Sequence, residues 1–192
     1  AYPDLEPRFV EEQTQHLITR LRNGNLDLAI MALPSEATGM VDSPLYTEKF
    51  SIVCPPDHPI AGREDVELVE LKDLDLLLLD DGHCLRDQVV DLCRHANINP
   101  AETTNSVTRA SSLTTIMQLV MGGLGCTLVP ESALATECHG KDVAIAHFAS
   151  DVTAEREVGL VFRSSAARAE EFREFGTLIT AAYNKAIERS RQ

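Results

Sequence analysis

Two cysteines lie nine residues apart in the segment best suited to chemistry, which reads DDGHCLRDQVVDLC from Asp80 to Cys93. A thiolate that attacks a peroxide becomes a sulfenic acid, and a second thiol can resolve that acid to a disulfide. The residues Asp80-Asp81-Gly82 are typical of a turn, and those that follow predict a helix from about His83 to Ala96. Cys84 would then occupy the first helical turn, where unpaired N–H groups and the helix dipole stabilise a thiolate.

Three side chains close to Cys84 could assist its attack on a peroxide. The departing oxygen gains negative charge as the O–O bond breaks, so it needs hydrogen-bond donors or a proton source. His83, Arg86 and Gln88 are donor types within about one helical turn of the sulfur. The negative charges of Asp80, Asp81 and Asp87 would disfavour the thiolate of Cys84. Alternatively, pairing with Asp87 could position the Arg86 guanidinium.

The second cysteine belongs to the hydrophobic face of the predicted helix. That face consists of Leu85, Val89, Leu92 and Cys93. Cys84 lies half a revolution away from Cys93 and roughly 13 Å from it along the helix axis. A disulfide needs Cα atoms within about 7 Å, so these two cysteines can join only if the helix unwinds. Such a segment would have two arrangements, selected by one oxidation step.

Other interpretations of these cysteines also fit the spacing. Taken alone, a Cys-x8-Cys pair in a cytosolic protein is usually two unrelated thiols. Zinc is another option, but the four nearest ligand types fit no common zinc pattern: His83, Cys84, Cys93 and His95. We therefore predict no metal site and no cofactor. Cys54 and Cys126 lie in strand-like apolar runs and are expected to be reduced and buried, while Cys138 lies in a predicted loop and is given no role.

Charge and composition limit the possible partners of this chain. It has 192 residues and a formal net charge of −13, from 17 basic and 30 acidic side chains. Nucleic-acid binding relies on clustered Lys and Arg, so the chain alone is expected to repel DNA. With 44% hydrophobic residues it should be globular, yet no apolar run approaches the length of a membrane span. The first residues carry no secretion signal, so we expect a cytoplasmic location and no membrane partner.

Strand and helix patterns alternate along the chain, which favours an α/β fold. The predicted strands are 5–11, 26–33, 45–53, 74–79, 103–108, 126–129, 143–147 and 157–162. The predicted helices are 14–23, 83–96, 111–121 and 166–189, with Ser111 or Ser112 as the N-cap of the third. The glycine-rich run 122–125 follows a helix and precedes a strand, so it predicts a helix end and not a dinucleotide-binding turn.

Several of these segments resemble the LysR-type transcription regulators. The runs Leu26-Asp27-Leu28-Ala29-Ile30 and His58-Pro59-Ile60-Ala61, and the segment from Ser112 to Pro130, are similar to three signatures of that broad family. The run Gly82-His83-Cys84-Leu85-Arg86-Asp87-Gln88 resembles the more specific sensor motif of the OxyR family, with Cys93 in the place of its resolving cysteine. The resemblance covers nearly the whole chain.

This resemblance implies two Rossmann-like α/β lobes, similar to a periplasmic binding protein and joined by two crossing strands. We expect lobe I at residues 1–43 and 153–192, lobe II at 44–152, and the crossings near 43–46 and 152–156. The resemblance also implies a homo-oligomer, a dimer or a tetramer, that reaches promoter DNA only through an N-terminal winged helix-turn-helix domain. That domain is expected to be absent from this chain, as are the family's first strand and helix and the pocket threonine that they carry.

Residue roles follow from the same resemblance. Cys84 matches the peroxidatic cysteine and Cys93 the resolving one. The residues expected to bind peroxide are Thr14, His83, Arg86, Gln88 and Arg156. Without the resemblance, Thr14 would be interpreted as a helix cap and Arg156 as a surface charge.

Three functions stay open at this point, of which we favour the first. It is a stoichiometric, non-enzymatic sensor that controls transcription. Hydrogen peroxide oxidises it, and a cellular thiol reductant returns it to the reduced state. The second is a LysR-type domain that binds a small organic effector between its lobes, with helix N-termini such as 111–112 holding an anion. The third is a thiol peroxidase, which would turn over repeatedly.

Overall fold

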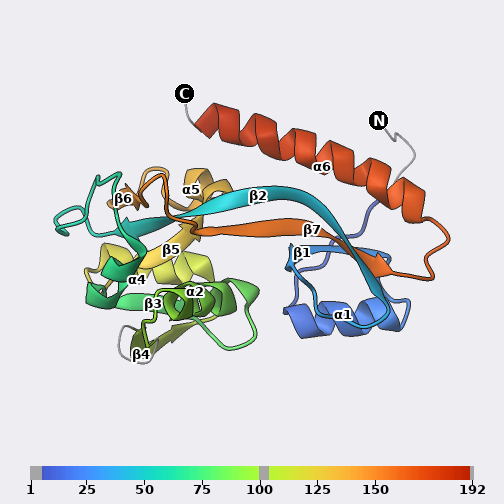
Figure 1. Cartoon of the computed structure of the whole chain (residues 1–192), viewed down its shortest axis with the longest axis horizontal. Helices are drawn as coiled ribbons and strands as arrows, with labels where there is room; N and C mark the ends of the chain where they lie inside the picture. The colour runs from blue at the N-terminus through green and yellow to red at the C-terminus, as the bar shows by residue number, and fades with distance from the viewer. Residues whose placement is uncertain (1–5, 100–103, 191–192) are drawn as a thin grey trace.

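A long two-stranded ribbon runs through the middle of the molecule and organises the rest (Figure 1). The computed structural model describes residues 6–99 and 104–190. Strand β2 (Met40–Cys54) pairs antiparallel with β7 (Glu155–Arg163), from Met40 opposite Arg163 to Lys49 opposite Glu155. The register shifts between Pro44 and Tyr46, where proline supplies no N–H to the ladder.

One end of the ribbon carries the smaller group of elements, drawn at the right of Figure 1. Helix α1 (Thr14–Arg22) leads into β1 (Leu28–Leu33), which pairs antiparallel with β7. A buried cluster joins α1 to the β1–β7 end of the sheet that these strands belong to, and the members of the cluster are Ile18, Leu21, Ala29, Met31 and Val161. The spacing of Leu17, Ile18 and Leu21 places the apolar face of α1 on the sheet.

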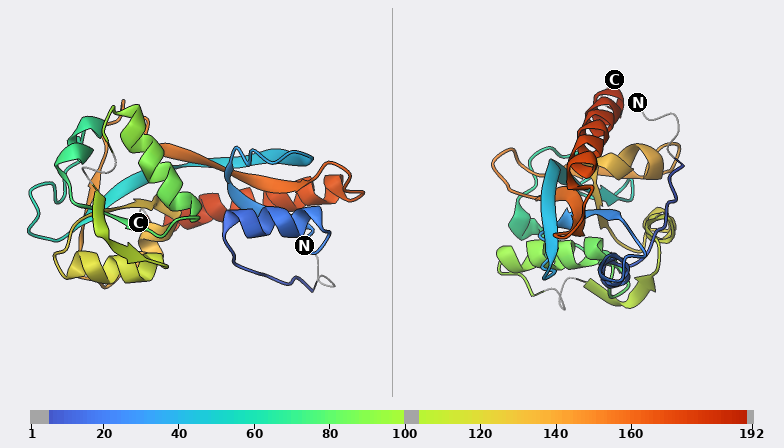
Figure 2. Two further views of the ribbon diagram at one scale, coloured as in Figure 1. Left: turned by 90° about the horizontal axis from the view of Figure 1, so that it is seen from below. Right: turned by 90° about the vertical axis from the view of Figure 1, so that its right-hand side faces the viewer.

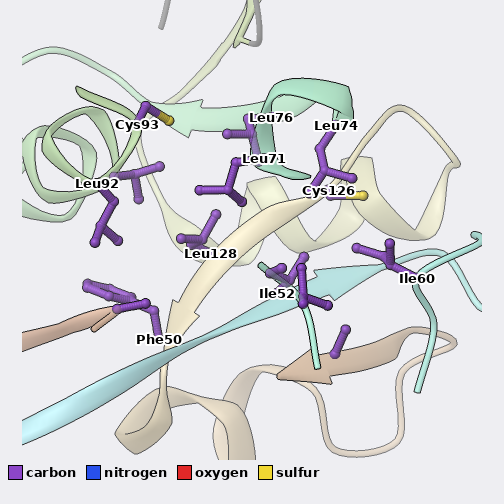
Figure 3. Close-up of a cluster of buried hydrophobic side chains, with 14 of the residues drawn as sticks. Phe50, Ile52, Ile60, Leu71, Leu74, Leu76, Leu92, Cys93, Cys126 and Leu128 are labelled. Carbon is purple, nitrogen blue, oxygen red and sulfur yellow. The ribbon is translucent and has the colours of Figure 1, made fainter. Parts of the chain in front are cut away.

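The other end of the ribbon carries the larger group. Strands β5 (Thr127–Pro130) and β6 (Ala144–His147) flank the last part of β2, while β3 (Leu76–Leu79) pairs parallel with β4 (Thr104–Ala110). Strands β1, β7, β2 and β5 belong, in that order, to one five-stranded sheet in which β6 also pairs with β2. An isolated bridge between Leu76 and Cys126 connects it to the sheet of β3 and β4. The helices of this group are η1 (Leu68–Asp73, a 3-10 helix), α2 (Cys84–His95), α4 (Leu113–Met121) and α5 (Glu131–Glu137). Its main core cluster includes Phe50, Ile52, Leu71, Leu92, Cys93 and Leu128 (Figure 3).

Helix α6 (Ala169–Ser190) lies along the ribbon and spans much of the length of the molecule (Figure 2). The Tyr183 ring stacks on Tyr46 of β2, with centroids 3.7 Å apart. The Thr180 hydroxyl donates to the carbonyl of Leu45 at 3.3 Å. A Cβ at Gly176 would lie 2.8 Å from Leu45 Cδ2, so a larger residue there would force the Leu45 side chain to shift. The helix thereby braces the ribbon that joins the two ends.

Most of the predicted elements are confirmed, with boundaries shifted by a few residues. The helix predicted at 83–96 is α2 (Cys84–His95), and Ser112 caps α4 by accepting a hydrogen bond from the Thr115 N–H. The strands predicted at 45–53 and 157–162 lie within the longer β2 and β7. Strand β2 runs through the crossing predicted near 43–46, and β7 starts at Glu155, within the crossing predicted near 152–156. The boundaries of the two lobes stay a prediction.

The strand predicted at 5–11 is wrong over the residues that the structure describes. Residues 6–13 form neither helix nor strand, and Leu5 lies outside the described residues, as does Thr103 at the start of another predicted strand. Pro7 cannot donate to a ladder, and the Phe9 side chain is 83% exposed. Without a partner strand or a surface to cover Phe9, this segment has no reason to adopt the strand conformation.

Candidate functional site

The segment around Cys84 connects a buried strand to a helix through a tight turn. The N–H of Asp80, just after β3, donates to the carbonyl of Ala110 at 2.9 Å. Gly82 then adopts a φ of 91°, a conformation that glycine permits without strain. His83 is the N-cap of α2, and its carbonyl accepts hydrogen bonds from the N–H groups of Arg86 and Asp87. Cys84 is the first residue of the helix, as predicted.

Cys84 is half-buried and carries a free thiol. At the first helical position the backbone N–H groups have no intrahelical acceptor, and the helix dipole adds partial positive charge. The His83 side chain takes no part in capping. The sulfur therefore lies where backbone donors and a histidine are both close along the chain.

The Arg86 guanidinium is held by two carboxylates. It lies 2.9 Å from Asp81 Oδ1 and 3.6 Å from Asp87 Oδ1, and its side chain is 29% exposed. This arrangement favours the alternative in which an aspartate positions Arg86. A direct role of Arg86 in peroxide binding stays a prediction.

Cys93 lies near the end of the same helix and is buried. Its exposed fraction is 0%, and it packs in the cluster that includes Val89, Leu92 and Leu76 (Figure 3). The burial expected from its helical face is confirmed. Since α2 is continuous from Cys84 to His95, the two cysteines lie roughly 13 Å apart along its axis. The structure joins no two of the five cysteines, all of which lie within the described residues, by a disulfide.

The structure brings together two of the predicted pocket residues, Gln88 and Arg156. Arg156 lies on β7, and its Nη1 donates to Gln88 Oε1 at 3.3 Å. Gln88 lies one helical turn after Cys84, on the same face of α2. On its other edge Arg156 donates to Glu48 Oε1, from Nε at 2.7 Å and from Nη2 at 2.6 Å. Arg156 is thus no free surface charge: its side chain is only 18% exposed.

The start of α1 approaches the turn that precedes Cys84. Thr14 is the first residue of α1, and Gln13 is its N-cap. The Gln13 Nε2 donates to the carbonyl of Asp81 at 3.4 Å, and a Cβ on Gly82 would lie 3.1 Å from Gln13 Oε1. This contact joins the two ends of the molecule beside the sensor segment. Thr14 is next to it in the chain, and its part in a peroxide site stays a prediction.

Sequence reasoning missed Glu48, Ser132 and Gln13. Glu48 lies between Thr47 and Lys49 on β2, so its surroundings in the sequence do not mark it as buried, and the partner that its carboxylate needs is 108 residues away. Ser132 contributes its backbone N–H, which carries no sequence signal. Gln13 adjoins the predicted Thr14 and was the easiest of the three to find.

The other thiols differ from Cys84 in their surroundings. Burial raises the pKa of Cys54 and of Cys138, and raises the pKa of Cys126 to about 12. Such thiols are poor nucleophiles at neutral pH. Within residues 6–99 and 104–190, no three His, Cys, Asp or Glu side chains gather as metal ligands. The zinc alternative therefore gains no support.

A hollow of about 1000 Å³ lies elsewhere, against β6 and α5. Its lining includes Ser51, Glu131 and His147 but none of the predicted site residues. Among the helices in the described part of the chain, none is both long and apolar enough to cross a bilayer.

Comparison with known proteins places the chain in a family. The family described as "LysR substrate binding domain" matches residues 1–184. The chain belongs to this family. A Mycobacterium avium relative named "Probable hydrogen peroxide-inducible genes activator" is 48% identical over 177 residues, which are 92% of this chain and 56% of that protein. The LysR-type domain thus spans little more than half the length of this relative.

Solved structures narrow the assignment to the OxyR regulatory domains. A cysteine-to-serine mutant of Corynebacterium glutamicum OxyR with H₂O₂ bound is 60% identical, with a TM-score of 0.94 over 97% of this chain and 58% of that one. The oxidized form of Corynebacterium glutamicum OxyR is also 60% identical, with a TM-score of 0.86 over 99% of this chain and 58% of that one. The predicted fold class, that of a LysR-type regulatory domain, is confirmed.

Proposed function

We propose that this chain is the peroxide-sensing regulatory domain of a transcription regulator, with Cys84 as the reactive thiol and Cys93 as its resolving partner. The observation that carries the proposal is the placement of the two thiols in one helix: Cys84 is at its accessible start, and Cys93 is buried near its end. The names of the relatives agree with this function, since one is a hydrogen peroxide-inducible genes activator.

The chemistry consumes one hydrogen peroxide for each disulfide. The Cys84 thiolate attacks one peroxide oxygen, an S–O bond forms, the O–O bond breaks, and the departing hydroxide takes up a proton to leave as water. The Cys93 thiolate then attacks the sulfenic sulfur of Cys84, and a second water leaves as the S–S bond forms. In total, two thiols lose two electrons and peroxide gains them. A cellular thiol reductant reverses the change.

Donors around Cys84 would assist the first step. His83 precedes Cys84 as the N-cap of α2, Gln88 follows it by one helical turn, and Arg156 reaches Gln88 from β7. Thr14 starts α1 beside the turn. They would donate hydrogen bonds to the oxygen that gains charge. Arg86 would act mainly through its pairing with Asp81, which holds the turn.

The second step requires a change of shape. Because an unbroken α2 keeps the two cysteines about two and a half turns apart, the helix between them must unwind before a disulfide can close. Cys93 would then leave the core cluster, which exposes its former neighbours. One covalent bond would thus select between two packings. In support, this chain matches the peroxide-bound mutant of the Corynebacterium protein better than the oxidized form, with TM-scores of 0.94 and 0.86.

In the whole protein, this change would alter DNA binding. The proposal includes an N-terminal winged helix-turn-helix domain, assembly into a dimer or tetramer, and a cytoplasmic location. It also includes the two lobes at 1–43 with 153–192 and at 44–152. The domain would act as a stoichiometric sensor and not as an enzyme.

Mass spectrometry of the peroxide-treated chain tests the proposal. We expect a peptide in which Cys84 is linked to Cys93, formed at one peroxide per chain. The Cys84→Ser variant should form no such link, while Cys138→Ser, which removes another half-buried thiol, should form it as the parent does. Absence of the linked peptide in the parent chain would contradict the proposal.

The two other functions make different predictions for the same sample. An effector-binding domain would bind a metabolite in the Cys84→Ser variant with unchanged affinity. The structure offers it little, since the Ser112 hydroxyl already caps α4. A thiol peroxidase would consume many equivalents of peroxide per chain when a reductant is supplied, whereas a sensor stops at about one until it is reduced.

A further inference from the structure

Glu48 is a carboxylate buried in the ribbon with no solvent exposure of its side chain. It lies on β2, directly opposite Arg156 of β7 in the antiparallel register. Burying a charge is costly unless the charge is paired and hydrogen-bonded. Partners outside β2 must therefore offset the cost of burying the Glu48 carboxylate.

Both oxygens of Glu48 have partners. Oε1 accepts hydrogen bonds from Arg156 Nε at 2.7 Å and from Arg156 Nη2 at 2.6 Å. Oε2 accepts from the backbone N–H of Ser132 at 3.1 Å. The carboxylate is thus fixed by two elements, and it holds one whole edge of the guanidinium.

The two hydrogen bonds from Arg156 to Glu48 determine the direction of the other edge of the guanidinium. The guanidinium is planar, so fixing Nε and Nη2 also fixes the direction of Nη1. Nη1 donates to Gln88 Oε1 at 3.3 Å, and the Phe50 ring lies 5.9 Å from the guanidinium carbon. Arg156 reaches α2 one turn after Cys84 because Glu48 leaves it no other direction.

The same contact sets the orientation of the Gln88 amide. Arginine has donors but no acceptor, so Gln88 must turn its oxygen to Arg156. Its two Nε2 hydrogens are then directed away from Arg156. They are then available as donors on the face of α2 that also carries Cys84, as is the second N–H of Nη1.

We propose that Glu48 is a positioning residue for the reaction of Cys84 with peroxide, and that it acts through Arg156 and Gln88. This inference rests on the proposed function for the reactive thiol, Cys84, and for the identity of the oxidant. Glu48 touches neither the sulfur nor the peroxide. It keeps two donors aligned with the oxygen that gains charge when the O–O bond breaks.

The ratio of two rates at Cys84 tests this role. Hydrogen peroxide needs the aligned donors, whereas iodoacetamide needs only an accessible thiolate. In Glu48→Gln we expect the peroxide rate to fall about tenfold or more, while the iodoacetamide rate changes less than about twofold. Both rates are read by mass spectrometry of the Cys84 peptide. The matched control is Glu157→Gln, an exposed acid next to Arg156 on β7, which should leave both rates unchanged.

A double variant separates action through Arg156 from a general disturbance. If Glu48 acts through Arg156, then Glu48→Gln combined with Arg156→Ala should react with peroxide no more slowly than Arg156→Ala alone. Losses that multiply would overturn the inference, as would an unchanged ratio of rates in Glu48→Gln.

Conservative variants keep the test decisive if Glu48→Gln fails to fold. Glu48→Asp keeps the buried charge but withdraws the carboxylate by one methylene, so it should show an intermediate peroxide rate. Arg156→Lys keeps the charge but lacks the planar fork, so it should react as slowly as Arg156→Ala. Full peroxide rates in both would overturn the inference. If Cys84 reacts normally but no disulfide follows, the resolving step is wrong and the role of Glu48 stands.

Discussion

Cys84 begins α2 at its accessible end, and Cys93 lies nine residues later in the same continuous helix with an exposed fraction of 0%. Both thiols are therefore placed by one element, and that element keeps them apart. Regular helical geometry separates them by roughly 13 Å along the axis, well beyond the reach of a disulfide. The stability of α2 is consequently part of the sensing chemistry.

The two cysteines should differ in what their removal costs the reduced fold. Cys84 is half-buried at a helix start, so Cys84→Ala should change the free energy of unfolding by no more than about 0.5 kcal/mol. Cys93→Ala leaves a gap in a packed cluster and should cost about 1 to 2 kcal/mol. Urea unfolding of both variants under reducing conditions measures this difference. Equal costs would mean that Cys93 is not held by the core.

Helix propensity at an exposed position should tune the oxidation equilibrium. Asp91 lies on the exposed face of α2 and pairs with Arg94 at 2.8 Å. Asp91→Gly and Asp91→Ala both remove that pair, but glycine costs the helix about 1 kcal/mol more than alanine. If oxidation unwinds α2, the disulfide in the glycine variant should be about fivefold harder to reduce, a potential roughly 20 mV lower. Equilibration against defined thiol buffers measures it, and equal potentials would contradict the unwinding.

The buried Cys126 should make the fold sensitive to alkali. Burial raises the pKa of this thiol to about 12, above the value of about 8.5 expected in an unfolded chain. The unfolded state therefore loses its proton first, so the free energy of unfolding should fall as the pH rises from about 8.5 towards 12. In Cys126→Ala the fall over this range should be shallower. Denaturant unfolding at several pH values tests this, and parallel curves for variant and parent would contradict it.

Much of the sensor segment could be predicted because its signals are local. Gly82 marks the turn, and the spacing of Val89, Leu92 and Cys93 fixes which face of α2 is buried. These signals placed the helix within one residue of its observed ends and predicted the burial of Cys93. The resemblance to the OxyR family added Arg156, whose type and position alone indicate only a surface charge.

The contacts that were missed depend on strand register and on distant segments. Glu48 meets Arg156 only because β2 and β7 align them across 108 residues of chain. The short helix α5 follows Pro130 and buries none of its residues, so hydrophobic spacing does not reveal it. In the strand predicted at 5–11, the apolar residues Phe9 and Val10 are exposed and residues 6–11 pair with no strand, and tertiary context decides such cases.

Amide hydrogen exchange along α2 tests the central claim most directly. In the reduced protein, the N–H groups from Gln88 to Cys93 should be protected, as should those of α4 (Leu113–Met121), which serves as the internal reference. After stoichiometric peroxide and formation of the linked peptide, we expect exchange in α2 to accelerate by about a hundredfold or more while α4 stays protected. A chain that carries the Cys84–Cys93 disulfide with α2 as protected as before would contradict the account.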